Sequence, residues 1–143
     1  MAQSRKVIHR TPKQVYTKWL AALRSGKYKQ TQDALRGKAL RGKGQHGAVG
    51  FCCLGVLCDL AVKDGGGTGE GWSDNHIAFE NEHDAIEYHR AAPPERMTNY
   101  LGITEDETQY LMAMNDIESR SFKYIARHIE RSIMPKALAR LKK

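Results

Sequence analysis

The chain has 143 residues, 41% of them hydrophobic, and a formal net charge of +7. This length suits one compact domain, and no stretch approaches the roughly 20 consecutive apolar residues that a membrane-spanning helix needs. The basic N-terminus "MAQSRKVIHRTPKQ" lacks the apolar run of a secretory signal, and an odd number of cysteines favours free thiols in a reducing compartment. We therefore expect a cytoplasmic protein that makes no membrane contact.

The first predicted element is a helix in "KQVYTKWLAALRSG", after Thr11-Pro12. The apolar residues of this segment recur at helical spacing, and Gly26 is expected to end the helix. These apolar residues are Val15, Trp19, Leu20 and Leu23. The next 25 residues contain five glycines and no helical stripe. They predict an extended segment near Tyr28–Leu35, a mobile basic loop over residues 36–46, and a short strand entering Phe51.

The segment "FCCLGVLCDLAVKDGGG" predicts the central helix of the fold. Between Cys52 and Val62 only Asp59 is polar, so this helix is expected to be buried on nearly every side. A glycine-rich loop then leads to Trp72. The alternation in "HIAFENEHDAIEYH" predicts a β-hairpin with its turn at "NEHD".

Three further segments predict helices toward the C-terminus. "PPERMTNYLG" suits a short helix, and Thr104 with Glu107 forms a capping box for the helix that follows. "SFKYIARHIERSI" carries an apolar stripe, which Pro135 is expected to interrupt before a basic tail. We predict a single α+β domain over residues 1–143 with a basic arm at 1–12 and a basic tail at 134–143. A central apolar helix, a small antiparallel hairpin or sheet and C-terminal helices would make up this domain.

The net charge hides three blocks of opposite sign. Residues 1–43 hold twelve Lys or Arg and one acid, residues 44–118 three bases and fourteen acids, and residues 119–143 eight bases and one acid. Basic ends around an acidic middle can attract phosphate-bearing partners. They can equally neutralise each other, within one chain or between the subunits of a homo-oligomer.

The three cysteines are poorly spaced for a metal. A structural zinc site needs ligand pairs two to four residues apart, whereas adjacent Cys52 and Cys53 diverge by roughly 100° on a helix and Cys58 lies five residues on. His46 could join the cysteines as a ligand, but a fourth ligand is not apparent in the sequence. The histidines and acids of "DNHIAFENEHDAIEYH" are better explained as a solvated hairpin face. The sequence predicts no metal, no cofactor and structural thiols.

A cysteine at a helix start is the alternative, because the helix dipole and free amides stabilise a thiolate there. Gln45 would then be an oxyanion donor, and the base one of His46, His76, His83 and His89. No local signature selects among these histidines. We therefore predict no catalytic residue and keep a cysteine-dependent enzyme as an alternative.

The basic segment "RSGKYKQTQDALRGKALRGKGQ" is the predicted ligand site. Guanidinium and ammonium groups neutralise phosphate, glycines admit backbone amides, and an aromatic ring stacks on a base. The site is placed where Ser25–Gln30 meets the entry to the cysteine helix. The predicted ligand-binding residues are Arg24, Lys27, Tyr28, Gln30, Arg36 and His46. The alternative is that Tyr28 belongs to the core and Gln30 caps a strand.

The chain resembles a group of small bacteriophage proteins of uncharacterised function. The resemblance is carried by the Trp-containing first helix, "SGKYKQ", "CCLGVLCD", and "ND" followed by "SFKYIARHIE". It implies a phage accessory protein in the host cytoplasm that sequesters a defence signal or blocks a host protein. We expect a non-enzymatic protein that binds an anionic partner, specifically a nucleotide-type small molecule, or a host protein. A small nucleic-acid-binding protein that uses both basic ends is the runner-up.

Overall fold

The computed structural model describes residues 10–38, 49–65, 71–73, 75–80, 83 and 85–142. Its helices are α1 (Pro12–Arg24), α2 (Cys53–Gly65), α3 (Glu95–Tyr100), α4 (Glu105–Asp116), α5 (Phe122–His128) and α6 (Met134–Leu141), and a π-helical segment, η1 (Ile129–Ile133), joins α5 to α6. The strands are β1 (Arg36–Lys38), β2 (Val49–Phe51), β3 (Gly71–Ser73), β4 (His76–Glu80) and β5 (Ile86–His89). They form an antiparallel β1–β2 pair and an antiparallel β3–β4–β5 sheet. The predicted α+β class is confirmed.

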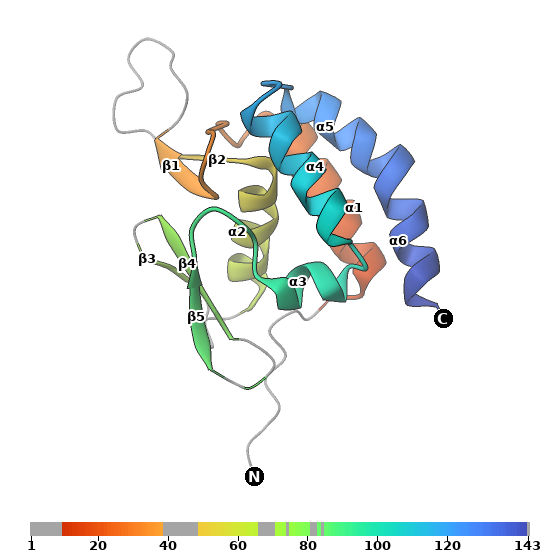
Figure 1. Ribbon diagram of the computed structural model, residues 1–143. Coiled ribbons are helices and arrows are strands. Elements are labelled where there is room, and N and C mark those ends of the chain that lie inside the picture. The colour runs from red at the N-terminus through yellow and green to blue at the C-terminus, as the bar shows by residue number, and fades with distance from the viewer. Residues whose placement is uncertain are drawn as a thin grey trace.

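Helix α2 lies in the middle of the molecule, with the two sheets on one side and α1, α4, α5 and α6 on the other (Figure 1). Its side chains from Cys53 to Cys58 are at most 1% exposed, as the apolar composition predicts. Trp19 of α1 packs on it, and its indole Nε1 donates to the Cys53 carbonyl over 2.9 Å. The central position of α2 follows from its nearly uniform hydrophobicity.

Helix α1 begins with the residues that favour a helix start. Thr11 and Gln14 form a capping box, Pro12 occupies the first turn, and Gly26 follows the helix with φ of +77°. The buried stripe contains Tyr16, whereas the sequence pattern favoured Val15. Tyr16 is fully buried because its hydroxyl finds a partner, the Leu101 carbonyl at 2.8 Å.

The segment between α1 and β2 differs from the prediction. Only Gln30 in the predicted extended stretch pairs with a strand, through a parallel bridge to Phe51, and the strand β1 begins at Arg36, inside the predicted basic loop. Asp33 adopts φ of +65° and turns the chain between these two points. Residues 39–48 and 66–70, where the sequence predicts the basic and glycine-rich loops, and residues 1–9 of the predicted basic arm lie outside the described residues.

The hairpin of β4 and β5 pairs antiparallel from Ile77↔His89 to Glu80↔Ile86, as predicted. Strand β3 adds a third strand that the sequence did not indicate. Its three residues are too few for an alternating pattern to show.

The C-terminal helix continues through Pro135, where an interruption was expected. Proline lacks an N–H and its ring crowds the carbonyl four residues earlier, so a regular α-helix is disfavoured there. The helical turn before Pro135 instead contains one extra residue, because the Met134 N–H donates to the Ile129 carbonyl, five residues earlier in the chain. Residues 134–141 of the predicted tail therefore form α6, and its Ala137 is fully buried. In the described part of the chain, no helix is long and apolar enough to cross a membrane.

Asn115, at the end of α4, is 1% exposed and joins three segments. Its amide nitrogen donates to the carbonyl of Thr31 and to the carboxylate of Asp116, each at 2.8 Å. Its amide oxygen accepts from Gln30 Nε2 at 2.8 Å and from the Cys53 backbone N–H at 3.2 Å. These bonds tie the end of α4 to the start of α2 and to the segment that leads into β1.

Replacing Asn115 with Ala should destabilise the protein by more than a single exposed hydrogen bond would. The Cys53 N–H, which donates to the Asn115 amide, would lose its acceptor in a buried position, and a buried polar group without a partner costs about 1–3 kcal/mol. Urea denaturation followed by circular dichroism measures the loss. The control is Asn99→Ala on the exposed surface of α3, which should change stability by less than about 0.5 kcal/mol. Equal effects of the two substitutions would contradict the role assigned to Asn115.

Gly55 is expected to tolerate no side chain at all. A Cβ atom there would lie 1.7 Å from the carbonyl oxygen of Leu35, which is backbone and cannot rotate away. Gly55→Ala should therefore cost at least about 3 kcal/mol, above the usual range for overpacking. The control Gly71→Ala introduces a Cβ with nothing within 4 Å, so its melting temperature should stay near that of the wild type. A stable Gly55→Ala variant would show that Leu35 does not cross α2 at this point.

Candidate functional site

The predicted ligand residues are distributed over three places in the structure. Gln30 donates to Asn115 and to the carbonyl of Arg120, and Arg24 pairs with Glu130 at 2.7 Å. Lys27 is exposed in the turn after α1, and His46 lies outside the described residues. Tyr28 and Arg36 belong to one cluster of aromatic and cationic side chains.

The aromatic cluster consists of the rings of Tyr28, Phe51 and Trp72 with the cations Arg36 and Lys63. The Tyr28 and Phe51 ring centroids are 5.3 Å apart, and those of Phe51 and Trp72 5.7 Å, both in edge-to-face geometry. The Arg36 guanidinium lies 5.4 Å from the Trp72 ring centroid, and the Lys63 ammonium 5.2 Å from the Tyr28 centroid. All three residues are partly buried. Sequence analysis missed Phe51, Trp72 and Lys63, which come from three separate elements.

Asp59, the single polar residue in the apolar part of α2, holds the aromatic cluster together. Its carboxylate accepts from the Tyr28 hydroxyl at 2.6 Å and from the Trp72 indole at 3.0 Å, and pairs with Lys63 at 3.1 Å. Burial, and then the hydrogen bond to Asp59, raise the pKa of Tyr28, so the phenol remains a donor at neutral pH. The hydrogen bonds to Tyr28 and Asp59 raise the pKa of Lys63, so the ammonium remains charged.

A second surface, the basic face, covers α1, α5, η1 and α6, which lie side by side (Figure 1). Its exposed cations without an ion pair in the described part of the chain are Lys13, Lys123, Arg127, Arg131, Lys136 and Lys142. Two more cations are paired, Arg24 with Glu130 and Arg140 with Glu107. A groove of about 370 Å³ lies over the first turns of α1, and two of its cations, Arg10 and Lys18, pair with Asp64 of α2. It is lined by Arg10, Thr11, Lys13, Gln14, Thr17 and Lys18.

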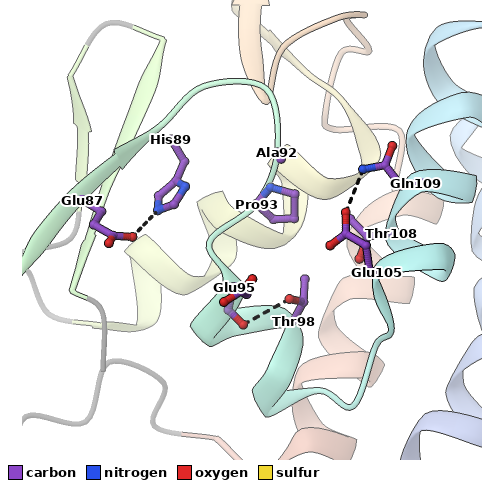
Figure 2. Close-up of a pocket in the computed structure, with 9 residues that line it drawn as sticks. All are labelled: Glu87, His89, Ala92, Pro93, Glu95, Thr98, Glu105, Thr108 and Gln109. Carbon is purple, nitrogen blue, oxygen red and sulfur yellow. Dashed lines mark hydrogen bonds and ion pairs between the residues drawn. The ribbon is translucent and has the colours of Figure 1, made fainter. Parts of the chain in front are cut away.

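A pocket of about 280 Å³ lies on another part of the molecule, between β5, α3 and the start of α4. Figure 2 shows Glu87 and His89 of β5 facing Glu95 of α3 and Glu105 of α4 across it. The polar groups bind one another: His89 lies 3.4 Å from Glu87, and Gln109 donates to Glu105 at 3.0 Å. With three carboxylates in its lining, this pocket repels the phosphate group that the sequence analysis expects as a ligand.

The thiols lie inside the core. Cys52 is 4% exposed and Cys53 and Cys58 are fully buried. Burial raises the pKa of Cys52 to about 12, even though the Gly55 N–H donates to its sulfur at 3.3 Å. Burial also raises the pKa of Cys53 and Cys58. At Cys53, the loss of solvation raises the pKa of the thiol more than the position at the start of α2 lowers it. In the described residues, no group of three or more His, Cys, Asp and Glu side chains is arranged to hold a metal ion.

Thiol labelling tests whether the cysteines are only structural. With a pKa of about 12, Cys52 is a thiolate in only one molecule in about 10⁵ at pH 7, against a few per cent for an exposed thiol. Ellman's reagent should therefore react slowly with the native protein and rapidly with all three thiols in denaturant. Fast stoichiometric labelling of native Cys52 at pH 7 would instead favour the cysteine-dependent enzyme.

No curated protein and no solved structure matches the chain. One family model does match, that of a domain of unknown function, DUF8296, and it covers residues 12–133. The match confirms that the chain resembles a family of uncharacterised function. The chain belongs to the DUF8296 family.

Proposed function

We propose that this protein binds an anionic partner without catalysis, and that the partner is the phosphate backbone of a nucleic acid. The observation that carries the proposal is the basic face, with six exposed cations that have no ion pair in the described part of the chain. The thiols, the strongest candidates for a nucleophile in the sequence, are buried. Binding therefore accounts for the described chemistry better than catalysis does.

The cations follow the period of the C-terminal helix. Lys123, Arg127 and Arg131 are four residues apart, and Lys136 follows after five, because η1 adds one residue to the turn. Like charges at this spacing destabilise a helix by about 0.2–0.5 kcal/mol per pair. An anion that lies along the helix relieves this repulsion, so the folded protein favours such a partner.

The dimensions of the basic face favour a polymer over a small anion. Residues 122–141 of α5, η1 and α6 extend about 30 Å at 1.5 Å per residue. A nucleic-acid strand presents a phosphate about every 3.4 Å along a duplex axis, so several phosphates lie within reach of one helix. The cations from Lys123 to Lys136 are spread over 13 residues, about 20 Å along the helix at 1.5 Å per residue, which is too far for one nucleotide to contact them all.

Sequestration of a nucleotide-type defence signal, and a phage origin, remain predictions from the resemblance. Sequestration of such a signal would also be the binding of an anion without catalysis. A blocked host protein or a homo-oligomer would have to present acidic groups to the basic face. The experiment below separates these partners from nucleic acid.

The triple variant Lys123→Glu, Arg127→Glu, Arg131→Glu should lose most nucleic-acid binding. In a fluorescence anisotropy titration with random-sequence duplex and single-stranded DNA, the wild type should bind with a strong salt dependence. The variant should lower the slope of log K against log salt by about 2–3, because each lost phosphate contact changes that slope by about 0.9 for duplex DNA. These side chains are exposed, so the melting temperature should change little.

The single variants Arg127→Glu and Arg90→Glu provide a matched control for net charge. Both replace an exposed arginine, but Arg90 lies after β5, on the opposite side of α2 from the basic face (Figure 1). Only Arg127→Glu should weaken DNA binding. Equal weakening by both variants, or no binding of the wild type at low salt, would overturn the proposal. Binding of an acidic protein or of a second copy in place of DNA would overturn it as well.

A further inference from the structure

We propose that the aromatic cluster is a second binding site, which takes a planar base that carries a phosphate. The ligand class is a nucleotide, either free or as an unstacked base of a single strand. The site lies on the opposite side of α2 from α6 (Figure 1), so it is separate from the basic face and does not depend on it. Its residues come from β1, β2, β3, the segment after α1, and α2.

The exposure of the three rings sets them apart from the aromatic residues of the core. Tyr16 and Trp19 are fully buried and Phe79 is 1% exposed. Tyr28, Phe51 and Trp72 pack against the same core but each retains exposed surface. An aromatic ring that is partly exposed and firmly held is a surface on which a base can stack, and this contact tolerates any base.

Asp59 holds two of these rings in place before a ligand arrives. Its carboxylate is bound by the Tyr28 hydroxyl and by the Trp72 indole, and Asp59 itself sits on the rigid central helix. Phe51 is fixed independently, because its backbone N–H donates to the Lys29 carbonyl at 2.8 Å. A site that is already ordered loses little conformational entropy when it binds.

The charge of the cluster favours an anion. Lys63 and Asp59 form an ion pair whose charges cancel, and the Arg36 guanidinium adds one positive charge to the cluster. Both cations lie about 5 Å from the ring centroids, where a phosphate attached to a stacked base can reach them. The cluster therefore combines the two recognition elements of a nucleotide, a stacking surface and adjacent cations.

Trp72 makes the proposal measurable. The chain has two tryptophans, and Trp19 is fully buried while Trp72 is partly exposed. A stacked base should quench Trp72 emission and leave Trp19 emission unchanged. AMP is therefore expected to quench the wild type and not the Trp72→Phe variant, and ribose 5-phosphate, which lacks a base, should quench neither.

Equilibrium dialysis with AMP measures the contribution of each group. Replacing Trp72 with Leu should weaken binding about 5- to 150-fold, the range for the loss of one stacking contact. Lys63→Gln should weaken AMP binding but leave any adenosine binding unchanged. Tyr88→Leu is the control, because Tyr88 is the most exposed tyrosine among the large hydrophobic residues and lies outside the cluster. Melting temperatures of all variants show whether a loss of binding is a loss of folding.

The two sources of the ligand are separated by comparing AMP with a short oligo-dA strand and with an abasic strand of equal length. Binding of AMP assigns the site to a free nucleotide, whereas quenching by oligo-dA alone assigns it to an unstacked base. Equal binding of AMP and ribose 5-phosphate, or quenching that persists in Trp72→Phe, would overturn the proposal. The triple variant of the basic face should retain this quenching by AMP. Failure here with intact, salt-dependent duplex binding would reject the nucleotide site alone and not the proposed function.

Discussion

The hydrogen bonds of Asn115 are the constraint on which the rest of the structure depends. One buried amide satisfies the first N–H of α2, the carbonyl of Thr31 and the side chain of Gln30. The segment from Tyr28 to Thr31 runs beside β2, where Thr31 N–H donates to the Phe51 carbonyl. Asn115 therefore fixes the position of the strand segments that carry Tyr28 and Phe51 relative to the central helix. A buried amide with all its partners specifies one arrangement, because any shift leaves a polar group unsatisfied.

The division of charge along the sequence becomes a division in space. The basic blocks supply α1 and the C-terminal helix, which pack side by side, and the acidic block supplies the hairpin, α3 and the start of α4. The ion pairs that join the basic and acidic blocks in the described residues include those of Arg10 and Lys18 with Asp64, Arg120 with Glu118, and Arg140 with Glu107. Arg140 also lowers the pKa of Glu107, although burial opposes the shift. Mutual neutralisation thus accounts for part of the positive charge. In the described residues it leaves Lys123, Arg127, Arg131, Lys136 and Lys142 of the basic face without an ion pair.

Helices were predictable from the sequence because their signals are local. The capping boxes at Thr11 and Thr104, and the apolar run of α2, each lie within a few residues. The strand β1 and the continuation of the helix through Pro135 depend on contacts with distant segments, and were missed. The π-helical turn is such a case. Proline normally predicts the end of a helix, but here the helix continues past Pro135 and buries Ala137 in the core.

The candidate site was only partly predictable, for the same reason. Tyr28 and Arg36 were selected as an aromatic and a cation near glycines, but their neighbours Phe51 and Trp72 come from elements that meet only in the folded chain. Gln30 was selected as a base reader, and its amide is directed instead to Asn115 and Arg120. One sequence signal did point to the cluster. Asp59 is the only polar residue between Cys52 and Val62, and a buried carboxylate must find donors. Its donors are Tyr28, Trp72 and Lys63.

The two proposed surfaces act independently at physiological ionic strength. A compact chain of 143 residues has a radius of gyration of about 14–15 Å, so opposite sides of it are farther apart than the Debye length of about 8 Å at 0.15 M salt. At low salt the screening length approaches the size of the molecule, and the acidic pocket then repels any polyanion that approaches from its side. In the proposed function, this repulsion would orient a polyanion toward the basic face, so the charge separation would affect the orientation of the encounter as well as the affinity. The acidic block would then contribute to the proposed binding without touching the partner.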